Sequence, residues 1–311
     1  MTILEAIIQG IIQGITEFLP ISSSGHLAIS QHFFGIRLPS ILFDIMLHLG
    51  TLVAVVVMYR RTVGRLIVEF FRLLGDLFRR DFHWSKMSRD RRLLIMLMVG
   101  LLPLFLLFLP IPGTGMDLKD LSEHLATDNS VVVEAIALLF TSFLLFSGIR
   151  MNKRIRIEKI VTNRKGQLVE SKGRRKIHAI DAVLIGGMQL IAAIFPGISR
   201  SGSTLSVGLM RGINRQTAMD YSFILGIPSI LAAVLVSVTD ASAQEVAQIG
   251  ILQLIIGTVV SCLVGFLAIK LLRWVVDSDK LVIFAYYTLI AGGIVLILGI
   301  IEAITGVPLF S

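Results

Sequence analysis

The sequence predicts an all-α, polytopic integral membrane protein with six spanning helices and two broken helical segments. The chain has 311 residues, of which 55% are hydrophobic and only 16% charged, whereas about a quarter of the residues in a soluble domain are charged. Apolar runs of roughly 20 residues, long enough to cross a ~30 Å hydrocarbon core, recur along the chain. The single cysteine, Cys262, lies inside such a run, which excludes a disulfide framework and a cysteine-based metal site.

Uninterrupted apolar runs define the six predicted spans. These are residues 41–59, 92–110, 131–150, 217–238, 249–272 and 281–303. Residues 3–35 and 178–212 are also apolar, but Pro, Gly and a serine cluster interrupt each of them near its middle. Irregular backbone is tolerated at membrane depth only where it is buried in protein or lines a cavity. We therefore expect each broken segment to be a re-entrant helix pair that lines a cavity.

The distribution of Lys and Arg orients the predicted spans. Residues 59–92 hold ten of these side chains and residues 150–176 hold eleven, whereas residues 110–130 hold one. The positive-inside rule places the two basic loops in the cytoplasm. The spans then alternate consistently only if segment 3–35 enters from the outside and segment 178–212 from the cytoplasm. Topology and contact with lipid headgroups explain the basic loops, so no nucleic-acid partner is expected.

The two broken segments resemble each other, which indicates an internal duplication. Ile21-Ser22-Ser23-Ser24-Gly25-His26 aligns with Ile198-Ser199-Arg200-Ser201-Gly202-Ser203 at an offset of 177 residues. Further matches, at an offset of 176 residues, are Gln13 with Gln189, Asp44 with Asp220, Leu49 with Leu225 and Gly50 with Gly226. Three predicted spans separate the copies, and an odd number inverts the second copy. The sequence thus predicts one membrane domain, 1–311, with inverted repeats 1–150 and 178–303 and a site near the midplane.

Polar side chains recur every four residues in the first broken segment. Glu5, Gln9, Gln13 and Glu17 therefore share one face of a helix that is otherwise apolar. Glu5 and Gln9 fit the solvated face of an interfacial helix. An ionisable residue at membrane depth is costly and usually faces a cavity. We therefore assign a functional role to Glu17, which is the deepest of the four in the sequence.

Each break combines the start of a short helix with hydroxyl groups. Pro20 ends the first helix, and Ser22, Ser23, Ser24 and Gly25 precede His26, which we place in the first turn of the next helix. The second break follows Pro196 and holds Ser199, Arg200, Ser201, Gly202 and Thr204. Helix N-termini and serine hydroxyls bind anions, and arginine adds a permanent bidentate donor. Two such breaks that converge from opposite faces predict a phosphate or diphosphate site.

Histidines and aspartates are assigned by their distance from the breaks. His26 is expected to be catalytic, because it follows the serine-rich break and lies nine residues after Glu17. His48 falls inside a predicted span, and its role is left open. The other histidines lie near predicted interfaces or in loops and are interpreted as structural. Asp44 and Asp220 are interpreted as capping or pairing residues near the ends of spans.

The two breaks are similar to the signature motifs of a known family. Gln13-Gly14-Ile15-Thr16-Glu17-Phe18-Leu19-Pro20-Ile21-Ser22-Ser23-Ser24-Gly25-His26 and Pro196-Gly197-Ile198-Ser199-Arg200-Ser201-Gly202 resemble those of the undecaprenyl-diphosphate phosphatases of the bacitracin-resistance type. The resemblance implies six spanning helices with two opposed re-entrant pairs in the plasma (inner) membrane. It also implies hydrolysis of undecaprenyl diphosphate to inorganic phosphate and undecaprenyl phosphate, the lipid carrier that cell-wall synthesis reuses.

The resemblance also implies roles for individual residues. Glu17, Ser23, His26 and Arg200 match catalytic positions, and Glu17 is the candidate metal ligand. Positions that match substrate contacts are Gln13, Ser22, Ser24, Gly25, Ser199, Ser201, Gly202 and Thr204. The family is linked to Mg²⁺ or Ca²⁺, but Gln13 stands where some members carry a first glutamate, which leaves one carboxylate for the cation. The expected partners are a polyprenyl diphosphate lipid, membrane lipids and a second copy of the chain.

Two mechanisms and a second function stay open. In one mechanism Ser23 attacks while His26 or Glu17 takes its proton, and water then releases phosphate. In the other, activated water attacks directly while Glu17 holds the cation. A polyprenyl-phosphate flippase could use the same anion site, since inverted repeats with broken helices are a transporter plan. The type 2 phosphatidic-acid phosphatases are excluded, because they need a histidine after their Ser-Arg and residues 205–210 contain none.

Overall fold

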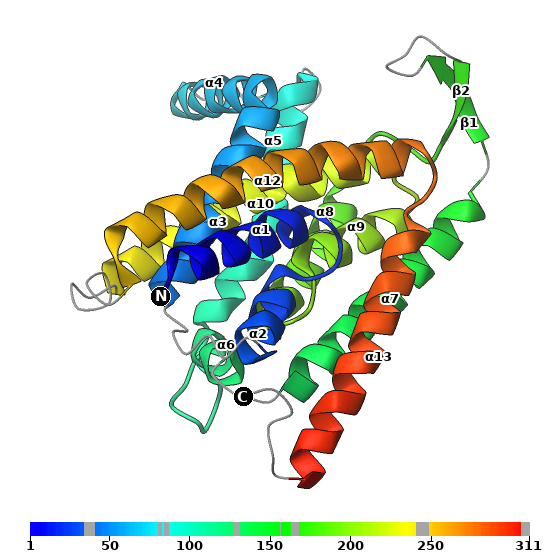
Figure 1. Cartoon of the computed structure of the whole chain (residues 1–311). Coiled ribbons are helices and arrows are strands. Elements are labelled where there is room, and N and C mark those ends of the chain that lie inside the picture. The colour runs from blue at the N-terminus through cyan, green and yellow to red at the C-terminus, as the bar shows by residue number, and fades with distance from the viewer. Residues whose placement is uncertain are drawn as a thin grey trace.

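The computed structural model describes residues 1–33, 41–79, 83, 87–126, 131–155, 157–162, 168–240 and 249–305. Within these ranges the chain is almost entirely helical (Figure 1). Five of the described helices are long and apolar enough to cross a membrane, or six if one bent pair is counted as a span. The prediction of a helical, polytopic membrane protein is therefore confirmed. The end of the predicted segment 3–35 and most of the connection 239–248 lie outside the described residues.

Each predicted span corresponds to a helix whose ends lie within a few residues of the expected ones. The helices are α3 (Ile41–Met58), α5 (Arg89–Leu101) continued by the 3₁₀-helix η2 (Leu102–Phe108), α7 (Val131–Lys153), α10 (Arg215–Asp240), α12 (Ile251–Asp277) and α13 (Val282–Thr305). Proline accounts for the change of helix type in the second span. Pro103 lies in the first turn of η2, and because it lacks an N–H it cannot continue the α-helical hydrogen-bond ladder.

Each broken segment forms a helical hairpin. The hairpins are α1 (Ile3–Phe18) with α2 (Ser23–Phe33), and α8 (Ala179–Ile194) with α9 (Arg200–Met210). In the first hairpin, the amide of Gln9 donates to the hydroxyl of Ser30 at 3.0 Å. In the second, Asp181 at the start of α8 accepts from Arg174 at 2.6 and 2.7 Å and from Arg211, just after α9, at 2.9 Å. Each segment thus ends close to where it begins.

Most of the polar stripe of α1 is inside the protein: Gln9, Gln13 and Glu17 are buried, whereas Glu5 is partly exposed. Glu5 completes a capping box with Thr2, so it serves the start of the helix. Gln9 is buried against α2, and the prediction that it is solvated is wrong. The spacing located the stripe correctly, but it could not show that α2 folds back over it.

The two basic segments contain regular structure that the sequence analysis treated as loops. α4 (Arg60–Phe78) follows α3 after a bend of 87°. β1 (Ile157–Thr162) and β2 (Leu168–Lys172) form an antiparallel pair in which Ile160 faces Glu170, and they are the exception to the all-α prediction among the described residues. β-Branched residues in β1 favour this strand. The Lys and Arg residues of these segments were used only to predict topology, so the helical spacing of α4 and the strand-forming residues of β1 were not considered.

Both basic elements lie towards one end of the molecule, though apart from each other. α4 and the β1–β2 hairpin occupy the upper end in Figure 1, whereas α6 (Leu118–Ala126) lies at the lower end.

Glycines allow the helices around the centre to approach closely. A Cβ atom at Gly10 of α1 would lie 2.8 Å from the carbonyl oxygen of Gly257 on α12. A Cβ atom at Gly186 of α8 would lie 2.1 Å from the carbonyl oxygen of Gly100 on α5. Small residues at helix interfaces are the usual means of close packing in a membrane, where no hydrophobic force draws helices together.

We expect Gly186→Ala to lower the melting temperature of the detergent-solubilised protein. The new methyl group would collide with the backbone of Gly100, which cannot rotate away, and overpacking of this kind costs about 1–3 kcal/mol. Gly187→Ala is the matched control, because a Cβ atom there meets no atom within 4 Å and the gain in helix propensity is the same. Equal melting temperatures of the two variants would contradict the close approach of α8 and α5.

Candidate active site

The two breaks are in direct contact. The N–H of Gly197 donates to the hydroxyl of Ser24 at 3.2 Å, and the hydroxyl of Ser201 donates to the carbonyl oxygen of Leu19 at 3.3 Å. A Cβ atom at Gly202 would lie 3.2 Å from the carbonyl oxygen of Pro20. The glycine therefore lets the second break close on the first, and motifs far apart in the sequence form one site.

A serine caps the short helix in both breaks. The hydroxyl of Ser22 accepts from the N–H of Gly25 at 3.2 Å, and that of Ser199 accepts from the N–H of Gly202 at 3.1 Å. Ser22 has a φ of 75°, a left-handed conformation that is uncommon for a residue other than glycine. These two hydroxyls hold the starts of α2 and α9 in place, so that the first N–H groups of both helices lie in the breaks.

Glu17 is the centre of the site. Its carboxylate is 6% exposed and accepts from Arg200 Nη2 at 2.6 Å, Ser23 Oγ at 2.7 Å and Gln13 Nε2 at 3.0 Å. His48 Nε2 lies 3.5 Å from the same carboxylate. A buried carboxylate is tolerated only when it is paired and hydrogen-bonded. Three of the residues predicted from the sequence, together with His48, supply those partners.

His26 is held by partners other than Ser23. Its Nδ1 lies 2.7 Å from the carbonyl oxygen of Ser22, which can only accept, so Nδ1 carries the proton. Its Nε2 lies 2.7 Å from the hydroxyl of Tyr287, whose ring stacks on the imidazole at 5.6 Å. Because Nε2 is occupied, Glu17 rather than His26 receives the hydrogen bond of Ser23 in this arrangement.

Tyr287 is a site residue that the sequence analysis missed. It lies on α13, 261 residues from His26. No motif surrounds it, and only the packing of α13 brings it to α2. A search for aromatic hydroxyls in the predicted spans would have returned it together with Tyr59, Tyr221 and Tyr286, without a means of choosing between them.

His48, whose role the sequence left open, belongs to the site. Its Nδ1 lies 2.7 Å from the carbonyl oxygen of Asp44, so Nδ1 carries a proton and Nε2 faces Glu17. His48 therefore places a ring nitrogen beside the carboxylate that Ser23 also contacts.

The hydroxyl of Thr204 lies further along α9 and bonds within the protein. It donates to the carbonyl oxygen of Arg200 at 2.8 Å and lies 2.5 Å from the hydroxyl of Ser222 on α10. Thr204 therefore joins α9 to α10 behind Arg200, whereas Ser23 and Arg200 reach Glu17 directly.

Gly226 makes room for the arginine. A Cβ atom at this position of α10 would lie 1.7 Å from Arg200 Nη1, so only glycine admits the guanidinium in its present place. The internal repeat drew attention to Gly226 through its match with Gly50, but the sequence did not reveal what it contacts.

The site suits a cation that takes part of its ligands from substrate oxygens. It does not suit a cation that protein side chains alone would surround. Among the described residues no group of three or more His, Cys, Asp or Glu side chains is placed to hold a metal ion. Gln13 Oε1, however, is buried without a hydrogen-bond partner, on the side chain that also contacts Glu17. An amide oxygen and a carboxylate are ligands that Mg²⁺ and Ca²⁺ accept, and Mg²⁺ commonly adds phosphate oxygens to one or two carboxylates.

Comparison with known proteins identifies the family. The family described as bacitracin resistance protein BacA matches residues 6–294, which include both breaks. The chain belongs to the BacA family. An undecaprenyl-diphosphatase of Halothermothrix orenii is 35% identical over 298 residues, which cover 96% of this chain and 98% of that protein. Undecaprenyl-diphosphatases of Syntrophotalea carbinolica (36% over 294 residues, 94% and 97% covered) and Methanosphaera stadtmanae (35% over 307 residues, 97% and 99% covered) are similarly related.

We expect Gly226→Ala to remove the activity of this BacA-family protein while the fold survives. The new methyl group would occupy the position of the Arg200 guanidinium, and the flexible arginine would move away from Glu17. We expect phosphate release from a polyprenyl diphosphate to fall by at least about 100-fold, the scale for loss of one preorganised charged donor. Gly293→Ala on α13, where a Cβ atom meets no atom within 4 Å, is the control. Full activity of Gly226→Ala would contradict the placement of Arg200.

Proposed function

We propose that this protein hydrolyses undecaprenyl diphosphate to undecaprenyl phosphate and inorganic phosphate, and so recycles the lipid carrier of cell-wall synthesis. Membership of the BacA family and the names of the related proteins support the reaction. The observation that carries it is the contact of Arg200 and Ser23 with one carboxylate, that of Glu17, at the starts of two short helices. This arrangement offers a terminal phosphate the guanidinium cation of Arg200 and the backbone N–H groups of two helix starts. It also offers Ser23 as a nucleophile and Glu17 as a base.

We propose that the two hairpins are re-entrant halves of an inverted repeat in one membrane domain. The capping contacts of Ser22 and Ser199 support this proposal, because they recur at the offset of 177 residues found in the sequence. The glycine contacts also recur. Gly10 and Gly186 differ by 176 positions, and each faces a glycine of a spanning helix. α3 packs on α10 and α7 packs on α13, and each of these contacts joins helices at matching positions of the two repeats, which supports a pseudo-two-fold axis between them.

The active site is assigned to the extracytoplasmic side of the plasma (inner) membrane. The common position of α4 and the β1–β2 hairpin at one end of the molecule supports a cytoplasmic location for that end. Segment 3–35 then enters from the opposite side, and the break that holds Ser23 opens outward. The lipid carrier is released there after cleavage.

The contacts around Glu17 favour serine as the nucleophile. Ser23 Oγ attacks the terminal phosphorus, the bond from that phosphorus to the bridging oxygen breaks, and undecaprenyl phosphate leaves. Glu17 takes the proton of Ser23, from which it already accepts a hydrogen bond at 2.7 Å. Water then attacks the phosphoserine, the hydroxyl of Ser23 is restored, and inorganic phosphate departs. Arg200 and the helix N-termini stabilise the negative charge of the transferred group.

A divalent cation, Mg²⁺ or Ca²⁺, is proposed as the cofactor. Glu17 and the free amide oxygen of Gln13 would hold it, and the cation would neutralise charge on the diphosphate. Gln13 thus takes the role that a second carboxylate would otherwise have. His26 keeps its proton on Nδ1 and orients the first turn of α2 through Ser22, while Tyr287 fixes its ring.

A polyprenyl-phosphate flippase is the second candidate function. The helical hairpins joined by breaks are the observation that favours it, because transporters place anion sites at such breaks. A flippase needs arginine and helix N-termini but forms no bond to serine. Ser23 therefore separates the two functions.

We expect purified protein to release phosphate from undecaprenyl diphosphate and Ser23→Ala to lose nearly all of this activity. Glu17→Gln should lose about 10²–10⁴-fold, the usual contribution of a general base. Glu5→Gln, on the same helix but within the capping box, is the matched control. Acid quenching during turnover, followed by mass spectrometry, should detect phosphoserine at position 23.

Each outcome distinguishes between the alternatives. Full hydrolysis by Ser23→Ala would favour direct attack by water over the serine route. Absence of hydrolysis by folded wild-type protein, with Mg²⁺ or Ca²⁺ added, together with transfer of polyprenyl phosphate across vesicles, would favour the flippase. Loss of hydrolysis on addition of EDTA would support the cation.

A further inference from the structure

α4 has a composition that suits neither the membrane interior nor free solution. Six of its 19 residues are charged, so it cannot cross the hydrocarbon core. Seven apolar side chains are nevertheless between 38% and 88% exposed. These are Ile67, Val68, Phe70, Phe71, Leu74, Leu77 and Phe78. A helix of this kind is stable where an apolar phase meets water.

Six of the seven exposed apolar side chains form one continuous face, and the seventh, Val68, lies at its edge. Positions 67, 70, 71, 74, 77 and 78 follow the three- and four-residue spacing of a helix face. Leu66, Glu69 and Leu73, which are buried, define the different face that packs towards α5. The apolar face is therefore not part of the contact between α4 and the rest of the described protein.

The attachment of α4 fixes its direction. It follows the spanning helix α3 after a bend of 87° and therefore runs across the direction of that span. Ion pairs tie its other face to the start of α5: Arg91 contacts Glu69 at 3.2 Å and Asp76 at 2.6 Å, and Arg65 contacts Asp90 at 3.0 Å. Because α3 ends and α5 begins on the same side, α4 lies at that membrane surface.

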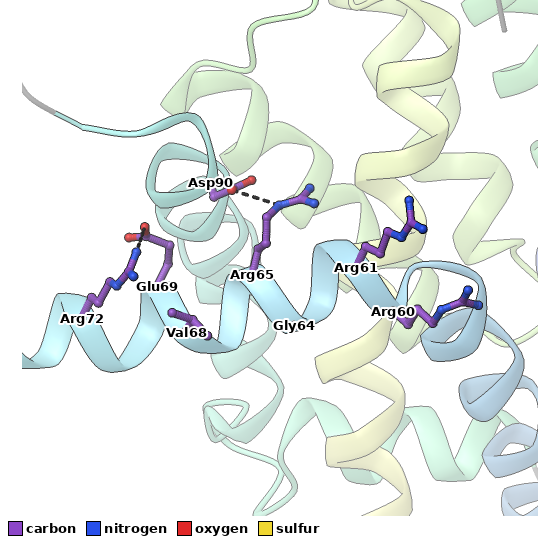
Figure 2. A pocket seen from close by; sticks show the side chains of 8 residues that line it. All are labelled: Arg60, Arg61, Gly64, Arg65, Val68, Glu69, Arg72 and Asp90. Atoms are coloured by element: carbon purple, nitrogen blue, oxygen red, sulfur yellow. Dashed lines mark hydrogen bonds and ion pairs between the residues drawn. The ribbon is translucent and has the colours of Figure 1, made fainter.

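Arginines line a cavity of about 570 Å³ beside the apolar face. Figure 2 shows them along α4, with Arg65 directed to Asp90 and Arg72 to Glu69. Arg60 and Arg61 are exposed and form no ion pair within the described part of the chain. The cavity thus holds four guanidinium groups and two carboxylates. Its excess positive charge is suited to phosphate groups.

We propose that α4 is an interfacial anchor that binds the phosphodiester headgroups of anionic phospholipids. Its apolar face enters the acyl-chain boundary, and its arginine cavity, through Arg60 and Arg61, takes the headgroup phosphates of the same leaflet. In the orientation proposed above this is the cytoplasmic leaflet. The binding surface is separate from the site around Glu17, so it does not depend on the phosphatase reaction.

Spin labels can place the two faces of α4 relative to the bilayer. Full-length Cys262→Ser protein with Phe71→Cys or Arg61→Cys would carry a nitroxide in phosphatidylcholine vesicles with one quarter phosphatidylglycerol. We expect the label at 71 to collide mainly with oxygen, which is concentrated in the lipid. A label at Leu263→Cys on α12, which faces the lipid, is the reference for this behaviour. The label at 61 should collide mainly with a water-soluble nickel complex. The anchor would be overturned if the nickel complex reached the label at 71 as readily as the label at 61. It would also be overturned if a second copy of the chain shielded the label at 71 from both reagents.

The number of phospholipid molecules that stay bound to the protein tests whether the arginine cavity binds headgroups. Native mass spectrometry would count phosphatidylglycerol and phosphatidylcholine molecules bound to wild type and to Arg60→Gln/Arg61→Gln. We expect weaker phosphatidylglycerol binding by roughly fivefold for each arginine lost, in line with the contribution of one basic residue at an anionic surface. Lys153→Gln/Arg154→Gln, at the end of α7, removes equal charge from the other basic segment but none from the arginine cavity, and should weaken binding less than twofold. Equal loss in both variants, or no preference over phosphatidylcholine, would overturn the headgroup site.

Discussion

The buried ion pair between Glu17 and Arg200 is the interaction on which the site depends. It joins the first hairpin to the second at 2.6 Å, across 183 positions of the sequence. Either charge alone would be costly at this depth, so the pair requires both hairpins to be in place. The preformed pair also makes the site reactive towards a phosphate. A phosphate that enters between the two side chains finds an arginine that is already oriented and largely buried, and it frees a carboxylate that can accept a proton from Ser23.

Two glycines, Gly202 and Gly226, make this pair geometrically possible. Gly202 lets one break touch Pro20 of the other, and Gly226 leaves the space that the guanidinium fills. Ser22 and Ser199 then cap the short helices, so that backbone donors and the ion pair lie at the same junction. Chemistry and packing are therefore specified by the same short segments, which explains why a few motifs are sufficient to identify the site.

The sequence predicted the spans and the site residues where the residue type has a single physical explanation at that depth in the membrane. Apolar runs located the spans, and Glu17 was singled out because an ionisable group is costly at membrane depth. Arg200 was singled out as a permanent bidentate donor beside hydroxyl groups, whereas the roles of Gln13 and Ser23 were implied by the family motifs. Tyr287 could not be predicted, since a tyrosine in a span has many uses and only the packing of α13 selects this one. The amphipathic period of α4 was present in the sequence, but its charges were read only as a topology signal.

Solid-state NMR can test directly whether the two hairpins bind one phosphate. Protein labelled with ¹⁵N in arginine side chains would be reconstituted with a non-hydrolysable polyprenyl methylenediphosphonate, and the coupling from ³¹P to guanidinium nitrogen would be measured. The account predicts strong dephasing that disappears in Arg200→Lys and persists in Arg211→Lys. Dephasing that survives in Arg200→Lys would place the phosphate elsewhere and contradict the proposed site.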